Sequence, residues 1–387
     1  MVNKEKMPLA VGIAFVAFTT QFGGGFASGA QIYQYFINYG IWTLIMPFVA
    51  QGLLALFFWY GLRYAYENKT YDYRSFSDKF YGRYKNIFSN LYEFIYLFLI
   101  CLAPAVAFAT GGSTLNMLTG MPYMVCTLII GLGIFVIVLF GTGMVRKAAA
   151  TISVLIILGL VVVLVPNIIA QWDQIMSAIN NLNQGIMPVA SIQDGSFGSA
   201  LWRAIVYALF QLASVGLMYQ HVKPATDIKQ INMSVIYMFI INAACMMLAV
   251  FGLLAVAYVP ELKEASVPMV LLVQTGVGSS LLTPIISILI ILGAVSTGVN
   301  MIAGLVTRIV DALERRDENE EKSDANRMKR NLVLALVVTM FTFAIAQFGL
   351  LPLISKGYAY LGYGTLIVVG IPFIIHFVYH KFVKLAD

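Results

Sequence analysis

The sequence is poor in charged residues and in the side chains that enzymes use for catalysis. Only 11% of its 387 residues are Asp, Glu, Lys or Arg, against roughly 25% in an average soluble domain. It has three cysteines and three histidines, and the cysteines lack the spacing of a metal site or a disulfide framework. No HExxH or paired-Asp motif is present. These shortages argue against an enzyme, and we expect no cofactor.

Apolar residues make up most of the chain. They account for 60% of it, and the mean hydropathy is +0.84. A soluble chain of this length could not bury so much apolar surface, whereas a lipid bilayer accepts it directly. We therefore predict an all-α, multi-pass protein of the plasma membrane. The net charge of +6 comes from Lys and Arg in the connections between spans, where it sets the orientation of the chain in the membrane. We therefore expect no nucleic-acid partner.

Ten stretches are long and apolar enough to cross a bilayer as helices, each needing about 20 residues. They cover approximately residues 8–37, 40–66, 87–114, 121–141, 145–166, 199–221, 231–258, 280–311, 331–348 and 357–380. Lys and Arg concentrate in every second connection, beginning before the first span and ending after the last. The positive-inside rule then predicts that both termini are cytoplasmic.

Two connections are long enough to carry structure of their own. Residues 68–86 alternate aromatic and charged side chains, which predicts an interfacial helix. Residues 259–279 predict a partly helical cap on the outer side. The two connections correspond if the chain consists of two five-span halves. Since five is odd, the halves would have opposite orientations, as in inverted-repeat transporters.

This division gives a first half, an extracellular connection and a second half, and each half should begin with a discontinuous helix. The proposed boundaries are 1–166, 167–198 and 199–387.

Three consecutive glycines interrupt the first span. Gly23, Gly24 and Gly25 are followed closely by Ser28 and Gly29, where most spans carry Leu, Ile or Val. Irregular backbone inside a bilayer is tolerated only where it is buried in protein or lines a wet cavity. We therefore predict that a small polar solute or ion binds at this break.

The sixth span shows a weaker interruption near its middle. Gln211, Ser214 and Gly216 stand in an otherwise apolar helix. A lone glycine in a span can also be a packing notch. The position of this segment at the head of the second half favours a second break.

The run Phe-Gly-Gly-Gly-Phe-Ala-Ser-Gly-Ala-Gln at residues 22–31 resembles the span 1 signature of the YkvI-like family of bacterial membrane proteins. It is more distantly similar to the amino acid–polyamine–organocation superfamily, which has the LeuT fold. The resemblance implies a 5+5 inverted repeat with substrate held between broken spans 1 and 6. In sodium-coupled members a cation also lies between span 1 carbonyls and span 8 hydroxyls.

Span 8 contains a turn similar to the sodium-binding turn of those transporters. By this resemblance the ligands would be the Gly293 carbonyl and the Ser296 and Thr297 hydroxyls, completed by carbonyls near Thr19 and Phe22. Sodium is a hard cation that prefers oxygen ligands. The alternative is that both hydroxyls bond back to carbonyls of their own helix.

Proton coupling is the competing mechanism. Some relatives place a Lys in span 5, but here Lys147 lies only at the start of that span, and the deeper positions are Ser153 and Val154. Glu93 could relay protons, because a carboxylate within a span is costly and usually functional. It lies about two turns into span 3, so we expect it to pair with an Arg or Lys of the interfacial connection.

The residues around the two breaks indicate the class of solute. Backbone N–H groups at Gly24, Gly25 and Phe26 would suit a carboxylate. An ammonium group could meet carbonyls released around residues 210–213. With no acidic side chain at either break, a zwitterion fits better than a free amine. Candidate substrate-binding residues are Gln21, Gly23, Gly24, Gly25, Phe26, Ala27, Ser28, Tyr207, Phe210, Gln211, Ala213 and Ser214.

The predicted function is therefore secondary active transport, by sodium symport, of an amino acid or similar small zwitterion. Alternatives are a proton-coupled or exchange transporter of another small organic solute, such as an amine or nucleobase, and a non-transporting sensor of the same fold. A manganese transporter would need Asp, Asn, Met or His at the breaks, where only Met218 is near. A channel would need a filter loop.

Overall fold

The computed structural model describes residues 8–140, 142–189, 191, 194–316 and 324–379, and every regular element within these ranges is helical. Six helices are long and apolar enough to cross a membrane alone. Two further spans belong to helix pairs bent by 80° and 77°, and two more are shorter apolar helices. Together these ten segments follow the predicted spans in order.

The first half begins with a span in three pieces. Its elements are α1 (Leu9–Gln21), α2 (Gly24–Ala27), α3 (Ala30–Tyr35), η1 (Ile37–Leu44), α4 (Met46–Asn68), α5 (Tyr73–Tyr81), η2 (Gly82–Tyr84), α6 (Lys85–Thr119), α7 (Tyr123–Phe140), α8 (Thr142–Ala170) and α9 (Trp172–Asn183). The predicted start of span 2 at residue 40 is wrong, because Gly40 has φ 72° and kinks η1. The regular helix starts at Met46.

The part of the chain from residue 197 onward ends in a segmented span. Its elements are α10 (Phe197–Leu212), η3 (Val215–Leu217), η4 (Tyr219–Val222), α11 (Ile228–Leu254), η5 (Pro260–Lys263), α12 (Pro268–Thr275), α13 (Ser279–Arg316), α14 (Asp324–Ala346), α15 (Leu350–Pro352), η6 (Leu353–Gly357), α16 (Tyr358–Thr365), η7 (Leu366–Gly370) and α17 (Ile371–Val378). Elements η6 and η7 are π-helical.

Both long connections contain the helices that the sequence predicts. Helix α5 lies within residues 68–86 and is capped by Asp72, whose carboxylate accepts hydrogen bonds from the backbone N–H groups of Arg74 and Ser75 at 3.1 and 2.9 Å. This is the usual N-cap arrangement. Elements η5 and α12 form the cap within residues 259–279.

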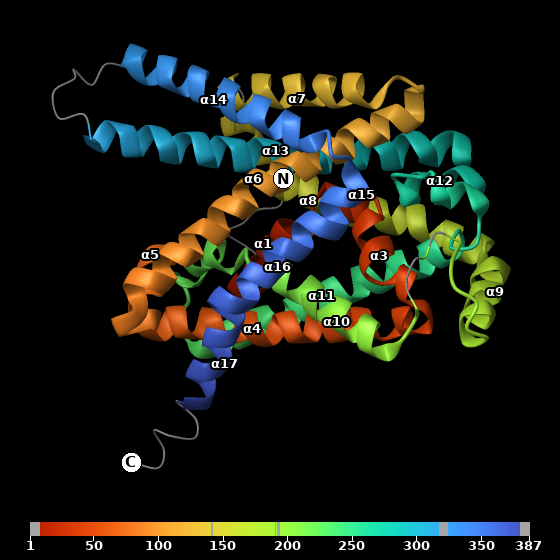
Figure 1. Ribbon diagram of the computed structural model, residues 1–387, viewed down its shortest axis with the longest axis horizontal. Coiled ribbons are helices and arrows are strands. Elements are labelled where there is room, and N and C mark those ends of the chain that lie inside the picture. The colour runs from red at the N-terminus through yellow and green to blue at the C-terminus, as the bar shows by residue number, and fades with distance from the viewer. Residues whose placement is uncertain (1–7, 141, 190, 192–193, 317–323, 380–387) are drawn as a thin grey trace.

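The long helices form two groups that meet at the broken first span. Helices α6, α7, α13 and α14 pack on one another, and α4, α10 and α11 pack together with α1. In Figure 1, α7, α13 and α14 run along one side of the molecule, and α4, α10 and α11 along the other. The short α2 contacts α6 and α13. The break therefore lies where the two groups meet.

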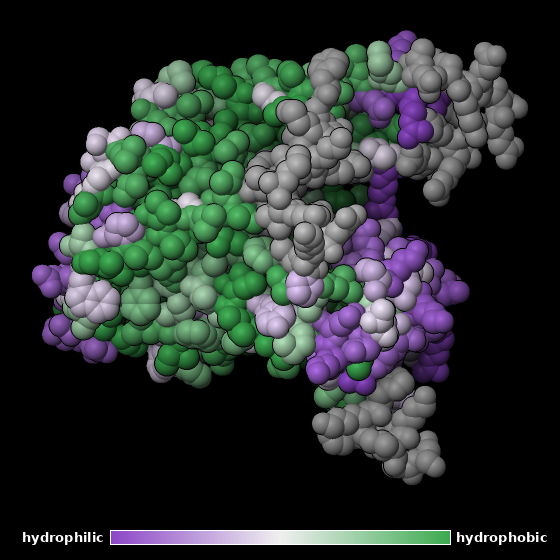
Figure 2. All heavy atoms as spheres, turned by 180° about the vertical axis from the view of Figure 1, so that it is seen from behind, coloured by the Kyte–Doolittle hydropathy of each residue, from purple (hydrophilic) through white to green (hydrophobic). Residues whose placement is uncertain are grey.

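Large apolar side chains cover much of the outside. Leu132 of α7, Leu281 of α13 and Met340 of α14 are all more than half exposed. Figure 2 shows one broad hydrophobic face, with hydrophilic residues gathered towards its edges. A bilayer would cover such a face, since lipid takes the place of a packing partner.

Candidate functional site

The first span is interrupted where its glycines predict a break. Helix α1 ends at Gln21, Phe22 has φ −107° and ψ 68°, and Gly23 is extended. After the single turn of α2, Gly29 adopts φ 79° before α3 begins. A side chain at Gly29 would be strained by that backbone angle. The span therefore changes course twice within eight residues.

Glycine at the break allows α13 to touch the backbone. A Cβ added to Gly23 would lie 2.9 Å from Thr297 Oγ1, and one on Gly24 would lie 2.9 Å from Ala294 Cβ. On the other side, Met269 of α12 donates its backbone N–H to the Ser28 carbonyl at 3.0 Å. The irregular backbone at Gly23 thus packs on span 8, and that at Ser28 is bonded to α12.

The sixth span tightens at its break without unwinding. Ala213 and Ser214 keep right-handed backbone angles, and the chain continues as a 3-10 turn. The Phe210 carbonyl accepts from the Ala213 N–H, and the Gln211 carbonyl accepts from the Ser214 N–H and, at 2.7 Å, from its hydroxyl. The expectation of released carbonyls here is wrong for these two groups, because the tight turn reuses them.

A small cavity of about 50 Å³ lies between the two broken spans. Seven of the candidate substrate-binding residues line it, namely Gln21, Gly23, Gly24, Gly25, Phe210, Gln211 and Ser214. Within the described chain, the backbone N–H groups of Gly24 and Gly25 have no hydrogen-bond acceptor. That of Phe26 donates to the Gly23 carbonyl at 3.1 Å, so this predicted donor is not free.

Five candidates do not line this cavity, and packing explains why. Phe26 packs edge-on against Phe22 with ring centroids 4.1 Å apart, and the Ser28 hydroxyl donates to the Gly25 carbonyl at 2.9 Å. Tyr207 lies behind Phe210 in an aromatic cluster, with centroids 4.9 Å apart. Ala27 and Ala213 are fully enclosed in the core.

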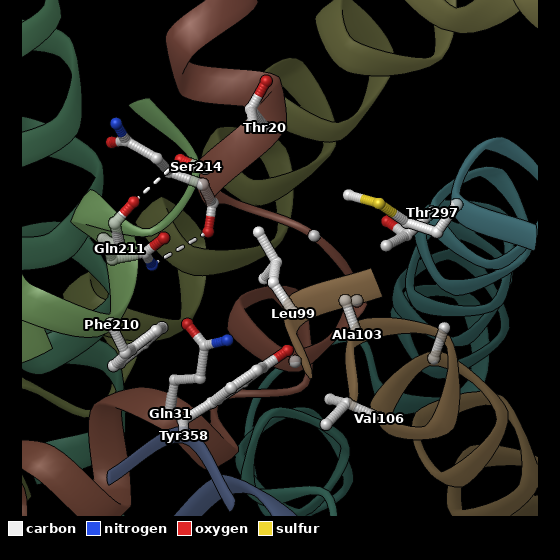
Figure 3. A pocket seen from close by; sticks show the side chains of 16 residues that line it. Thr20, Gln31, Leu99, Ala103, Val106, Phe210, Gln211, Ser214, Thr297 and Tyr358 are labelled. Atoms are coloured by element: carbon white, nitrogen blue, oxygen red, sulfur yellow. Dashed lines mark hydrogen bonds between the residues drawn. The ribbon is translucent and has the colours of Figure 1, made fainter. Parts of the chain in front are cut away.

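Nine lining residues were not among the candidate substrate-binding residues. They are Thr20, Gln31, Leu99, Ala103, Val106, Ala107, Thr297, Met301 and Tyr358. Figure 3 shows that the carboxamide of Gln31 reaches into the cavity between Phe210 and Leu99. The one feature of the sequence that could have indicated Gln31 is the presence of an amide side chain within a membrane span. The apolar members carry no signal, because such residues are ordinary in any span.

Aromatic rings and two hydrogen bonds close one side of the cavity. Tyr358 stacks on Phe210 with centroids 4.6 Å apart. The Tyr35 hydroxyl donates to the Ile354 carbonyl at 3.1 Å, and Arg203 Nη2 donates to the Ser355 carbonyl at 2.8 Å. Both acceptors belong to the π-helical η6. These contacts fasten the first and sixth spans to the last one.

A chain of buried carboxamides links four helices beside the cavity. Gln211 Nε2 of α10 donates to the Gln21 carbonyl at 3.1 Å. Asn242 Nδ2 of α11 donates to Gln21 Oε1 at 2.5 Å and to Gln51 Oε1 of α4 at 3.2 Å. The side-chain oxygen of Gln21 and its backbone carbonyl are therefore both hydrogen-bonded within the protein.

A second cavity of about 260 Å³ adjoins the first. It is lined by all five candidate sodium ligands, Thr19, Phe22, Gly293, Ser296 and Thr297. The Thr297 hydroxyl donates to the Gly293 carbonyl at 2.9 Å, which is the back-bonding that the alternative reading predicts. A hydroxyl oxygen that donates its hydrogen keeps lone pairs for a cation. The two readings are compatible at this residue.

Glu93 has a different partner from the one expected. Its carboxylate forms an ion pair with Arg308 of α13, and the Tyr73 hydroxyl of α5 donates to it at 2.5 Å. The interfacial connection thus supplies the hydroxyl, and the cation comes from the end of span 8. The side chains of Lys147 and Ser153 lie outside the described part of the structure.

Comparisons with known proteins support the fold. No family model matches the chain, and no curated protein matches its sequence, so the YkvI-like resemblance stays a prediction. A substrate-bound, outward-open Na⁺-coupled sialic acid symporter matches with TM-score 0.58 and 13% identity, over 96% of this chain and 90% of that one. A manganese transporter from Eremococcus coleocola has TM-score 0.45 and 14% identity, over 95% and 85%. The first match shows that the chain is a polytopic membrane protein with the LeuT-like transporter fold.

Proposed function

We propose that this protein is a secondary active transporter that uses sodium to move an amino acid or similar small zwitterion by alternating access. The observation that carries the proposal is the shared wall of the two cavities. Thr20, Gly23, Thr297 and Met301 line both of them. One cavity lies between the broken spans, and the other contains every candidate sodium ligand.

The end of α1 supports a cation in the second cavity. The helix stops at Gln21, and within the described chain the Thr19 carbonyl accepts no backbone hydrogen bond. The carbonyl end of a helix carries partial negative charge. Neutral oxygens at a helix end, joined by hydroxyls from α13, form a ligand set that suits sodium.

The central cavity supports a small uncharged or zwitterionic solute. No Asp, Glu, Lys or Arg is among its lining residues, so a solute with net charge would lack a counter-ion there, at a large cost. Free N–H groups at Gly24 and Gly25 offer donors to a carboxylate. The small volume favours solutes such as glycine or alanine in this conformation.

The openings of the cavities support an inward-facing arrangement. Asn300 lines the second cavity and is exposed, whereas Phe210 and Tyr358 close the first from the other side. Figure 2 shows a notch in the hydrophilic end of the molecule, and Figure 1 places the end of α4 and helix α5 at that end. The basic connections of the positive-inside rule make it the cytoplasmic end. Both termini are then cytoplasmic, in the plasma membrane.

Thermal unfolding of the purified protein tests this function. We would measure Tm with amino acids, amines and nucleobases, each in sodium and in potassium chloride. The proposal predicts that a small amino acid raises Tm more in sodium, because both ligands bind the folded state. Counterflow of the stabilising solute into proteoliposomes then separates a carrier from a sensor. If no solute exchanges under any gradient, the protein is not a transporter.

A further inference from the structure

Gln31 has a buried carboxamide without a hydrogen bond. The residue is 4% exposed, and Oε1 is buried with no donor in reach. Within the described residues its side-chain nitrogen also has no acceptor. Buried polar groups are nearly always hydrogen-bonded, and an unpaired one costs free energy. The cavity into which the carboxamide points is the place where a partner can be bound.

The nitrogen end of the Gln31 carboxamide lies next to the glycine break. Its Nε2 lies 3.0 Å from where a Cβ on Gly25 would stand, with Val106 Cγ1 3.4 Å from the same point. The nitrogen is therefore beside the glycine break. In Figure 3 the oxygen is directed away from the break, towards Phe210.

Three hydroxyls of the cavity have already used their hydrogens. Thr20 donates its hydroxyl to the Val16 carbonyl, Ser214 to Gln211 and Thr297 to Gly293, at 2.8, 2.7 and 2.9 Å. These three hydroxyls can only accept a hydrogen bond from a solute. These hydroxyls and Gln31 Oε1 therefore offer acceptors on several sides of the cavity. A group with several hydrogen-bond donors, such as an ammonium, can pair with these acceptors.

We propose, resting on the transport function above, that Gln31 accepts a hydrogen bond from the amino group of the transported solute and thereby selects amino acids over acids of the same size. The adjacent Nε2 faces the break, where it donates to the solute's carboxylate. The Gln31 side chain then forms hydrogen bonds with both the ammonium and the carboxylate of a zwitterion.

The test compares Gln31→Leu with Gln34→Leu and the wild type. Gln34 lies three residues further along α3 and does not line the cavity, so it is a matched control. The probes are glycine and L-alanine, each paired with the acid that lacks the amino group, acetate and propionate. Affinity is measured in sodium by the rise in Tm with probe concentration, and Tm is also recorded without a probe.

We expect the wild type and Gln34→Leu to bind an amino acid and to discriminate against its paired acid. Gln31→Leu should bind the amino acid at least about tenfold more weakly, which is the loss for one hydrogen bond to a charged group. Without a probe its Tm should be equal to or above that of the wild type, because no hydrogen bond within the protein is lost.

Two results would overturn the inference and leave the transport function in place. They are unchanged amino acid affinity in Gln31→Leu, and equal binding of alanine and propionate by the wild type. A lower Tm of Gln31→Leu without a probe would also count against it, because Gln31 would then have a structural partner. If the wild type binds no amino acid in sodium, the proposed substrate class and this inference both fail.

Discussion

Thr297 of α13 lies against Gly23 at the first break of span 1, with its Oγ1 2.9 Å from where a Cβ would stand. The same hydroxyl donates to the Gly293 carbonyl. A substitution at either position therefore affects the solute cavity and the candidate cation cavity together, since both residues line both cavities. Predictions about one site are also predictions about the other.

Gly24→Ala should separate α2 from α13. Its new Cβ would lie 2.9 Å from Ala294 Cβ and 3.0 Å from Ala294 Cα, and backbone cannot move aside as a side chain can. Overpacking of this kind costs about 1–3 kcal/mol, so we expect lower Tm and lost solute binding. Gly12→Ala in α1 is the control, because its Cβ meets no atom within 4 Å. Equal behaviour of the two variants would contradict this packing.

Replacing Ser296 and Thr297 together by Ala should abolish the extra stability that sodium gives over potassium. The change removes two hydroxyl ligands and leaves the helix backbone intact. The measurement is Tm against sodium concentration at constant ionic strength. Thr307→Ala is the control, because Thr307 makes the same back-bond, to the Ala303 carbonyl at 2.8 Å, away from the cavity. Sodium-specific stabilisation that persists in the double variant rules out this cation site.

Asn242→Leu should destabilise the protein by about 1–3 kcal/mol, because it leaves the side-chain oxygens of Gln21 and Gln51 buried without a donor. Chemical or thermal unfolding in detergent measures the loss. Adding Gln51→Leu to the Asn242→Leu variant removes one of the two side-chain oxygens that lost their donor. The double variant should therefore lose less than the sum of the two single variants. Strict additivity would mean that the carboxamides do not act as a connected chain.

Arg308→Met should destabilise the protein by about 1–3 kcal/mol, because it leaves the Glu93 carboxylate without its ion-pair partner. The loss should be smaller than for a fully buried pair, since the Arg308 and Glu93 side chains are 33% and 28% exposed. Glu93→Gln should restore part of that stability in the double variant. The exposed i, i+4 pair of Arg63 and Glu67 is the control, and removing it should cost no more than about 0.5 kcal/mol. Sodium-specific stabilisation should survive Glu93→Gln. Its loss would favour a coupling role for this acid.

The span count and the first break could be predicted from sequence because both are local. Apolar length identifies a span, and three glycines leave a helix without side chains to hold it. The candidate sodium residues of span 8 lie at i, i+3 and i+4 positions on one helix face. They reach the break because α13 packs against α2.

The rest of the site depends on contacts between distant residues. Glu93 and Arg308 are 215 positions apart, and no pattern within span 3 names its partner. Leu99 and Val106 enter the cavity only because α6 crosses the break. The behaviour of span 6 was also not predictable, because Ala213 and Ser214 can continue a helical turn as readily as interrupt it.

The shared wall of the two cavities has a thermodynamic consequence. If bound sodium fixes Thr297 and Gly23 and thereby tightens solute binding by some factor, the solute must tighten sodium binding by the same factor. The two dissociation constants can be measured separately in the purified protein, without any membrane gradient. Their change measures the coupling free energy between the two cavities, and substitutions in the shared wall of Thr20, Gly23, Thr297 and Met301 would show whether that wall carries it.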